Sequence, residues 1–190
     1  MARVSVPRVL TSGLVCCLLL VSPPSRGQEQ TPIRYRTEAN FLAHFPNFVE
    51  WPQSAFADGQ APVLLCLFGE ADFGSSLSEL TKDVKAEGRR VEVQTVKTTG
   101  QSRSCHILFI GREDARRYAA ILSPIQDSPV LTVGETANFL DAGGIVNFVF
   151  GETLQIDINA GAADRAHLKI RANLAALARQ VIHRDKTKEP

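Results

Sequence analysis

The sequence predicts a single-domain three-layer α/β sandwich, in which a mixed, mostly parallel sheet carries helices on both faces. Two apolar runs, residues 62–68 and 106–110, show no alternation, as is typical of strands covered on both sides. Helical and extended segments alternate along the chain, which favours parallel strands joined by crossovers. Residues 145–150 and 153–158 are separated by Gly151 and Glu152 alone, and therefore predict an antiparallel hairpin at one edge of the sheet.

The first 27 residues have the pattern of an export signal. An apolar run from Val9 to Val21 follows the basic residues Arg3 and Arg8. This run has the length of a signal-peptide core and is shorter than a membrane span. We expect cleavage near Gly27 and an exported product, with an uncleaved anchor helix as the alternative.

Removing 27 of the 190 residues leaves 163, which is enough for one domain with its own core. We assign this domain to residues 28–183 and expect residues 184–190 to form a disordered tail. The signal contains three arginines and no acid, so 18 basic and 20 acidic side chains remain, a net charge of about −2. This balance gives no electrostatic reason to expect nucleic acid or an anionic membrane as a partner.

The first element of the domain is a helix over residues 37–49. Phe41, Phe45 and Phe48 recur at intervals of three and four, which indicates one buried helical face. Pro46 lies inside this pattern and predicts a kink or a new start there. Pro52 ends the helix, because proline disfavours helical geometry in the residue before it.

The remaining elements follow the same alternation. Residues 90–96 alternate with period two, which predicts a strand near the edge of the sheet. A broad apolar face over residues 162–182 predicts one long, deeply buried final helix. The other predicted elements are helices over 75–81, 113–122 and 136–140 and a strand over 129–133.

Charged residues follow three of the glycines that end predicted strands. Glu70, Arg112 and Glu135 come directly after Gly69, Gly111 and Gly134. Ligands bind at the carboxyl ends of the strands in such sheets, so convergence of these side chains would form a small polar crevice. Ordinary strand-to-loop punctuation gives the same dipeptides and remains the alternative.

The search for catalytic and metal motifs is negative. The sequence has no nucleophile elbow, no His-Glu-x-x-His and no phosphate-binding loop. The four histidines are isolated from one another, so we expect packing or solvation rather than metal binding for each. Glu70 and Asp72 could form an acid/base pair, although surface carboxylates are commoner. We therefore predict a protein that is not an enzyme and that has no metal or cofactor.

Cys66 and Cys105 are the only cysteines after the signal. One lies in the first sheet strand and the other directly precedes the strand at 106–110. If these strands are neighbours, the two backbones come within disulfide range. We expect a disulfide between them, with two buried free thiols as the alternative.

Taken in order, several segments of the chain resemble the YfiR family of periplasmic proteins, and together they cover nearly the whole mature chain. The most specific are the Phe-Val-Glu-Trp-Pro segment, the cysteine spacing and the Leu-Thr-Val-Gly strand. The matching segments are 39–42, 45, 48–52, 65–69, 73–74, 88–91, 105–110, 129–134, 139, 143–148, 156–159 and 168–170.

The resemblance implies a periplasmic regulator that binds the sensing domain of an inner-membrane diguanylate cyclase and represses it, lowering cyclic di-GMP and biofilm growth. It implies redox responsiveness through Cys66 and Cys105, although this mature chain lacks the cysteines for a second disulfide found in some members. For the partner contact we single out Phe41, Phe45 and Phe48 together with Trp51. The alternative is a small-ligand sensor that uses the Glu70, Arg112, Glu135 crevice and acts on another membrane receptor, such as a histidine kinase. A homodimer is also compatible with these patterns.

Overall fold

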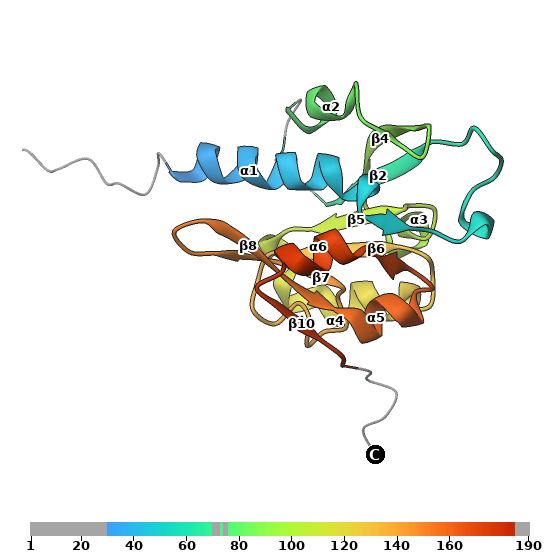
Figure 1. The fold of residues 1–190 in the computed structure, drawn as a ribbon. Coiled ribbons are helices and arrows are strands. Elements are labelled where there is room, and N and C mark those ends of the chain that lie inside the picture. Colours follow the sequence, from blue (N-terminus) through green and yellow to red (C-terminus); the bar gives the residue numbers. More distant parts are fainter. Residues whose placement is uncertain (1–29, 70–72, 74–75, 185–190) are drawn as a thin grey trace, which may run out of the picture.

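The computed structural model describes residues 30–69, 73 and 76–184, and these confirm the predicted α/β sandwich (Figure 1). The expected signal peptide, Glu70, Asp72 and residues 185–190 of the expected tail lie outside the described residues. The helices are α1 Gln30–His44, α2 Ser76–Thr81, α3 Thr99–Ser102, α4 Tyr118–Leu122, α5 Ala160–Arg165 and α6 Ala172–Leu177. The strands are β1 Val49–Glu50, β2 Val63–Phe68, β3 Lys85–Ala86, β4 Arg89–Val96, β5 Ile107–Ile110, β6 Leu131–Gly134, β7 Val146–Phe150, β8 Leu154–Asn159, β9 Lys169–Ile170 and β10 Gln180–Ile182.

The main sheet has the order β10-β8-β7-β6-β5-β2-β4-β3. Strand β2 pairs in parallel with β4 on one side and with β5 on the other, and β6 and β7 continue the parallel order. Strands β7 and β8 form the predicted antiparallel hairpin, and β10 pairs outside it. The chain reverses direction across the sheet at β2, and this reversal creates a topological switch point between β2 and β5.

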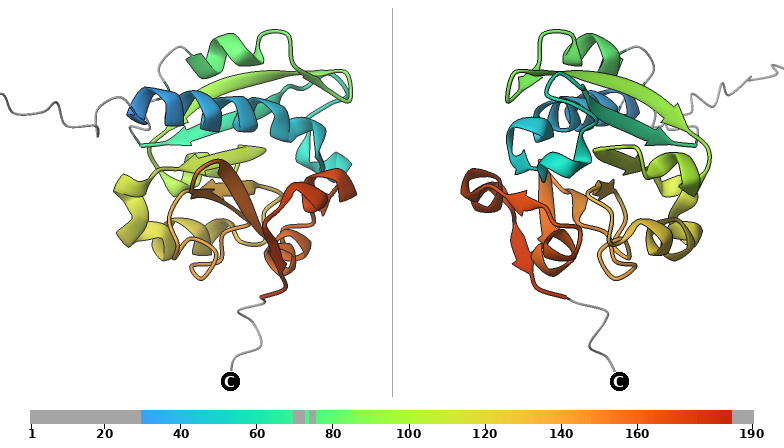
Figure 2. Two further views of the ribbon diagram at one scale, coloured as in Figure 1. Left: turned by 60° about the vertical axis from the view of Figure 1, so that its left-hand side comes forward. Right: turned by 90° about the vertical axis from the view of Figure 1, so that its right-hand side faces the viewer.

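The two faces of the sheet belong to two separate hydrophobic clusters. In β5, Ile107 and Phe109 point into one cluster, while Leu108 and Ile110 point into the other. This division follows from the alternation of side chains along a strand. Helices α1 and α2 cover the first face and α4 covers the second, which gives the three layers (Figure 2). Burial on both sides explains why the strand sequence is apolar throughout.

Helix α1 ends five residues before the predicted end at residue 49. It stops at His44, and a 3-10 turn over Phe45–Asn47 holds Pro46 in its first turn. A missing backbone N–H has little cost at that place, because those donors have no partner within the helix. The chain then extends into β1. The kink predicted at Pro46 is thus a change of helix type.

The long helix predicted over residues 162–182 is wrong. Helix α5 ends at Arg165, and His167 takes the left-handed backbone conformation with φ of 57°. The Leu168 N–H bonds to the Ala163 carbonyl at 2.9 Å, and the His167 N–H bonds to the Asp164 carbonyl at 3.0 Å. These two bonds are the hydrogen-bond pattern of a Schellman helix end. The apolar residues of this segment belong to four short elements, α5, β9, α6 and β10. Each element is so short that its buried residues, read along the sequence, look like part of one helical face.

Strand β9 closes the molecule by pairing with β1. Val49 lies opposite Ile170 and Glu50 opposite Lys169 in this antiparallel pair. The Arg171 N–H extends it with a bond to the Phe48 carbonyl at 2.9 Å. The small sheet therefore ties the end of the α1 region to the C-terminal quarter of the chain.

The helix predicted over residues 136–140 is a series of turns instead. The Gly144 N–H reaches back to the Phe139 carbonyl, and Gly143 has φ of 102°. The prediction that this segment ends at Gly143 and Gly144 was therefore correct, although the segment is too short to be a helix.

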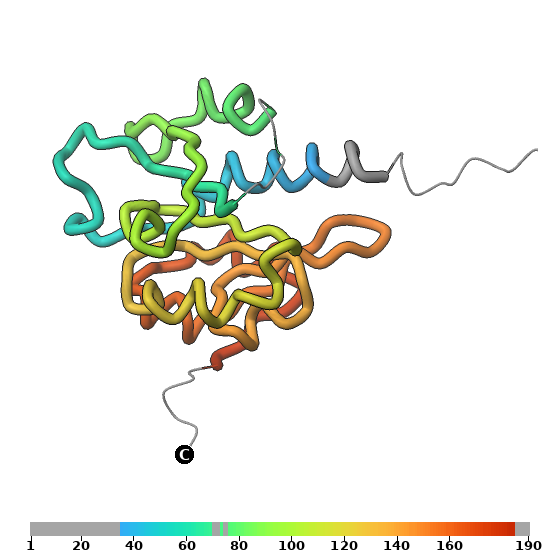
Figure 3. The backbone as a smooth tube through the Cα atoms, turned by 180° about the vertical axis from the view of Figure 1, so that it is seen from behind, coloured from blue at the N-terminus to red at the C-terminus, as the bar shows by residue number. Residues whose placement is uncertain are grey.

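The predicted helix 113–122 forms as a 3-10 turn over Arg112–Arg117 followed by α4. Seen from behind, the β7–β8 hairpin extends alongside α1 (Figure 3).

Candidate functional site

Arg112 and Glu135, two of the three side chains considered for a polar crevice, meet at the carboxyl ends of β5 and β6. The Glu135 carboxylate accepts a hydrogen bond from the Arg112 backbone N–H at 2.9 Å and two from its guanidinium at 3.0 and 3.3 Å. The Glu135 side chain is only 2% exposed. These charge-assisted bonds compensate for the removal of a carboxylate from water.

Glu38 of α1 is buried against this ion pair, and the sequence reasoning missed it. Burial, and next the charge of Glu135, raise the pKa of Glu38 to about 9. Glu38 is therefore protonated at neutral pH and donates a hydrogen bond to the Glu135 carboxylate. Burial also raises the pKa of Glu135, and its contacts with Arg112 oppose that shift. An acidic residue four positions before Leu42, on the apolar stripe of the helix, is the sequence signal that could have identified it.

A cleft of about 560 Å³ opens beside the ion pair. Asn147 of β7 and Asp157 of β8 lie opposite each other across these two strands, and both line the cleft. Each is 4% exposed. Arg179 donates two hydrogen bonds to the Asp157 carboxylate, at 2.9 and 2.5 Å. The buried Oδ1 of Asn147 has no hydrogen-bond partner among the described residues.

The charges of the cleft are balanced. Three arginines line it, and each one contacts a carboxylate that also lines it. A wall of this kind offers both donors and acceptors without a strong preference for one sign of charge. The pairs are Arg112 with Glu135, Arg179 with Asp157, and Arg184 with Asp141.

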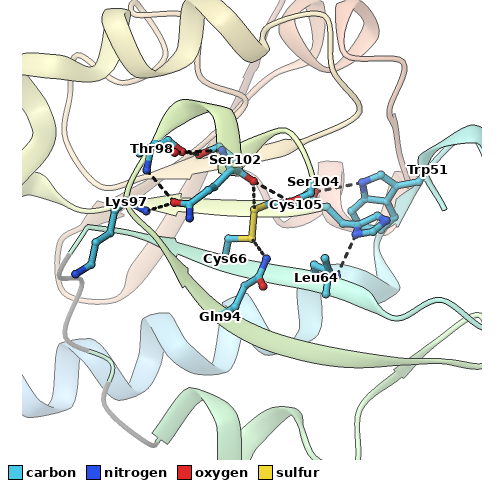
Figure 4. The surroundings of a disulfide bond; sticks show 11 residues. Trp51, Leu64, Cys66, Gln94, Lys97, Thr98, Ser102, Ser104 and Cys105 are labelled. Carbon is cyan, nitrogen blue, oxygen red and sulfur yellow. Dashed lines mark hydrogen bonds between the residues drawn. A yellow bond between two sulfur atoms is a disulfide. The ribbon is translucent and has the colours of Figure 1, made fainter. Parts of the chain in front are cut away.

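Cys66 and Cys105 form the predicted disulfide, which joins β2 to the residues just before β5 (Figure 4). Their Cα atoms are 5.9 Å apart. The cysteines are 0% and 3% exposed, so a reductant in solution has no direct path to the sulfurs. The Gln94 side-chain amide donates to the Cys66 sulfur at 3.2 Å. The bond thus lies at the switch point of the sheet, inside the second hydrophobic cluster.

His106 connects three segments at the amino-terminal edge of the sheet. Its Nδ1 accepts a hydrogen bond from the Leu64 N–H at 3.0 Å, so its Nε2 carries the proton and donates to the Ala55 carbonyl at 3.1 Å. Its own carbonyl accepts the Trp51 indole N–H at 3.2 Å. Burial, and also the charge of Arg89, lower the pKa of the imidazole. The ring is therefore neutral and structural, in agreement with packing as its predicted role.

The four aromatic residues singled out for partner contact differ in exposure. Phe45 is 1% exposed, and its ring stacks on Phe148 at 5.9 Å. Phe41, Phe48 and Trp51 are half-buried and pack against the same cluster. Phe45 therefore belongs to the core, whereas Phe41, Phe48 and Trp51 keep part of their surface exposed.

Comparison with known protein families gives one match that spans most of the chain. A model of the YfiR/HmsC-like family matches residues 35–179, more than half of the chain. The chain belongs to the YfiR/HmsC-like family. The match begins inside α1 and ends next to β10, so the site residues Glu38, Arg112 and Glu135 all lie within the YfiR/HmsC-like region. No curated protein matches the chain.

Two solved structures are similar to this YfiR/HmsC-like chain. One is an ABC domain from Streptococcus pneumoniae in complex with L-Trp, with a TM-score of 0.50 and 14% identity over 76% of this chain. The other is a conserved domain protein from Vibrio cholerae, with a TM-score of 0.49 and 12% identity over 77% of this chain. The chain spans 60% of the length of each. At this identity the first likeness concerns the fold alone.

The YfiR/HmsC-like family is regulatory rather than catalytic. Within the described part of the chain, no three His, Cys, Asp or Glu side chains are grouped so that they could hold a metal ion. None of the described helices is long and apolar enough to cross a membrane.

Proposed function

We propose that this protein is a periplasmic regulator that binds the periplasmic domain of an inner-membrane diguanylate cyclase and holds the enzyme inactive. The family match over residues 35–179 carries this proposal. The buried disulfide supports it, because such bonds persist in oxidising compartments outside the cytoplasm. The signal-like residues 1–27 also favour export.

Deletion of the gene in its native host, with direct measurement of cyclic di-GMP, tests the regulatory role. The proposal expects cyclic di-GMP to rise on deletion and to return to its former level when the gene is restored. In-cell crosslinking of the tagged mature protein should then recover a transmembrane diguanylate cyclase. An unchanged cyclic di-GMP level in the deletion strain would contradict the proposal.

The half-buried aromatic residues supply a matched pair of variants for the partner surface. If Phe48 contacts the partner, Phe48→Ala should weaken crosslinking, and its effect on the melting temperature should be the smaller of the two because the ring is only half-buried. Phe45→Ala should lower the melting temperature more, because that ring is fully buried. Unaltered crosslinking by Phe48→Ala would remove this residue from the proposed surface.

We further propose that regulation depends on redox state through the stability of the fold. Because Cys66 and Cys105 are buried, the bond can be reduced only after local opening of the sheet. The reduced chain would then be less stable and a weaker repressor. Equal repression by the oxidised and the reduced protein would argue for a purely structural bond.

A second candidate function is ligand sensing through the 560 Å³ cleft, with a signal to another membrane receptor such as a histidine kinase. The buried Asn147 Oδ1 favours this candidate, because a ligand N–H or O–H could satisfy it. Arg112 and Glu135, predicted as crevice residues, line the same cleft.

Native mass spectrometry of the protein purified from its host tests the sensing candidate. A bound small molecule should be found on the wild-type chain, and it should be lost in Asn147→Leu, which removes the Asn147 amide from the lining of the cleft. Absence of any bound molecule, together with no thermal shift from amino acids or nucleotides, would count against ligand sensing.

A further inference from the structure

We propose that the contact between Glu38 and Glu135 is a proton-dependent lock on helix α1, so that loss of one proton releases the helix from the sheet. The contact joins two elements that are far apart in sequence: Glu38 belongs to α1, and Glu135 directly follows β6. This regulatory device is independent of which partner or ligand the protein binds.

The geometry requires one proton between the two carboxyl groups. Glu38 is 0% exposed, and Glu135 is 7% exposed as a whole residue, so bulk water has little access to either carboxyl group. Their hydrogen bond needs a donor, and only a protonated carboxyl can supply one. Arg112 holds Glu135 with three hydrogen bonds, and Glu38 is therefore the member of the pair that carries the proton.

The charges around the pair make its ionisation costly. Among the described residues, Arg112 and the exposed Glu113 face it from the segment after β5, and Tyr118 faces it from α4. The Tyr118 hydroxyl donates to the carbonyls of Ile110 and Gly111 and carries no charge. With Glu38 protonated, one guanidinium faces the carboxylates of Glu135 and Glu113. With Glu38 ionised, the same guanidinium faces three carboxylates, two of them in contact.

Helix α1 is the element that can yield to this repulsion. Strands β5 and β6 lie in the middle of the sheet and are paired on both sides, whereas α1 is held by side-chain packing and leads into a short 3-10 turn. The helix lies along one outer face of the sandwich in every view (Figures 1 and 2). Its departure would uncover part of Phe148, which Phe41 of α1 and Phe45 of the following 3-10 turn contact at ring distances of 6.1 and 5.9 Å.

Hydrogen–deuterium exchange of the full mature chain tests the lock. Exchange of the α1 amides at residues 35–44 should be compared with that of β5 at pH 5, 6, 7 and 8, after correction for the intrinsic rate. Opening coupled to the loss of one proton becomes about tenfold more frequent with each pH unit. We expect this increase in α1 of the wild type, and not in β5.

Glu38→Gln keeps a hydrogen-bond donor and removes the titration, so its α1 exchange should not depend on pH. Glu113→Gln is the matched control and should keep the wild-type slope, because that side chain is exposed. If Glu38→Gln loosened the helix at every pH, the wild-type slope would still decide the matter. Wild-type α1 protection that is flat from pH 5 to 8, or an unchanged slope in Glu38→Gln, would overturn the proposal.

Discussion

Phe139 shows how single residues determine the turn beside the candidate site. A Cβ atom on Gly134 or on Gly144 would lie 2.2 Å from the nearest atom of the Phe139 ring, on opposite sides of it. The ring also meets Tyr118 edge-on at 4.8 Å. Any side chain larger than hydrogen at either position would clash with the Phe139 ring. The two glycines therefore allow this ring to pack in the core next to Glu135.

Gly144→Ala should therefore destabilise the protein by about 1–3 kcal/mol, the usual cost of overpacking. Denaturant unfolding measures this effect, and adding Phe139→Leu should recover part of it. Gly59→Ala is the control, because nothing lies within 4 Å of its Cβ position, and it should be close to neutral. Equal stability of the Gly144 and Gly59 variants would refute the spatial argument.

The disulfide between Cys66 and Cys105 should contribute several kcal/mol to the stability of the fold. Cys66 and Cys105 are 39 positions apart, and a crosslink of that span stabilises a fold by about 4 kcal/mol on the chain-entropy model. The double variant Cys66→Ala, Cys105→Ala should therefore melt roughly 8–16 °C lower than the oxidised protein. Reduced wild-type protein should melt close to the double variant. A double variant as stable as the oxidised chain would show that the bond contributes nothing to stability.

At the scale of the elements, the sequence predicted fully buried strands well and short elements with one buried side poorly. Strands β2 and β5 were recognised from their apolar runs, because burial on both faces leaves a direct mark on composition. The secondary structure of the C-terminal quarter was predicted wrongly. Elements α5, β9 and α6 are only two to six residues long and each buries one side, so their apolar residues together resemble the apolar face of one long helix. His167 ends α5 in the left-handed conformation without the glycine that usually marks such an end.

His167→Gly separates the two interpretations of this segment. Within a continuous helix, replacing histidine by glycine would cost a few tenths of a kcal/mol, whereas in the left-handed position it should stabilise the fold by about 1 kcal/mol. His167→Val should destabilise the fold, because a β-branched residue tolerates that conformation poorly. Urea midpoints of the three proteins give the answer, and a lower midpoint for the glycine variant would restore the long helix.

At the scale of the whole molecule, the candidate site combines segments that only the tertiary fold brings together. Arg112 and Glu135 could be predicted because the carboxyl ends of parallel strands share one edge of the sheet. Glu38 could not be placed there, because no sequence pattern tells which strand ends a helix will cover. Asn147 and Asp157 could not be assigned to the cleft without knowing how β7 pairs with β8. A shift of this pairing by one residue would move every side chain of the strand to the other face of the sheet.

Glu38 and His106 are two of the buried groups that make the stability of the folded chain depend on pH, and the raised pKa of Glu135 acts in the same direction as that of Glu38. The pKa of Glu38 is raised from 4.5 to about 9, so its stabilising contribution is complete below pH 4.5 and is lost as the pH rises to 9. The pKa of His106 is lowered from 6.5, so its contribution is complete above pH 6.5 and is lost as the pH falls. Just below pH 6.5 the effects of Glu38 and His106 on stability oppose each other. Above pH 6.5 the contribution of His106 no longer changes, and the effect of Glu38 continues.

The free energy of unfolding should therefore change least just below pH 6.5, where the two effects oppose each other, and the ionisation of Glu38 should lower it above pH 6.5 by up to about 1.4 kcal/mol per pH unit. Urea unfolding at pH 5, 6, 7, 8 and 9 measures this curve. Glu38→Gln should flatten the curve above pH 6.5, since the amide keeps the hydrogen bond to Glu135 and cannot ionise. Glu113→Gln, at an exposed position, should keep the slope of the wild-type curve above pH 6.5, because Glu38 still titrates in that variant. A wild-type protein that becomes more stable from pH 7 to 9 would show that Glu38 is not protonated in the folded chain.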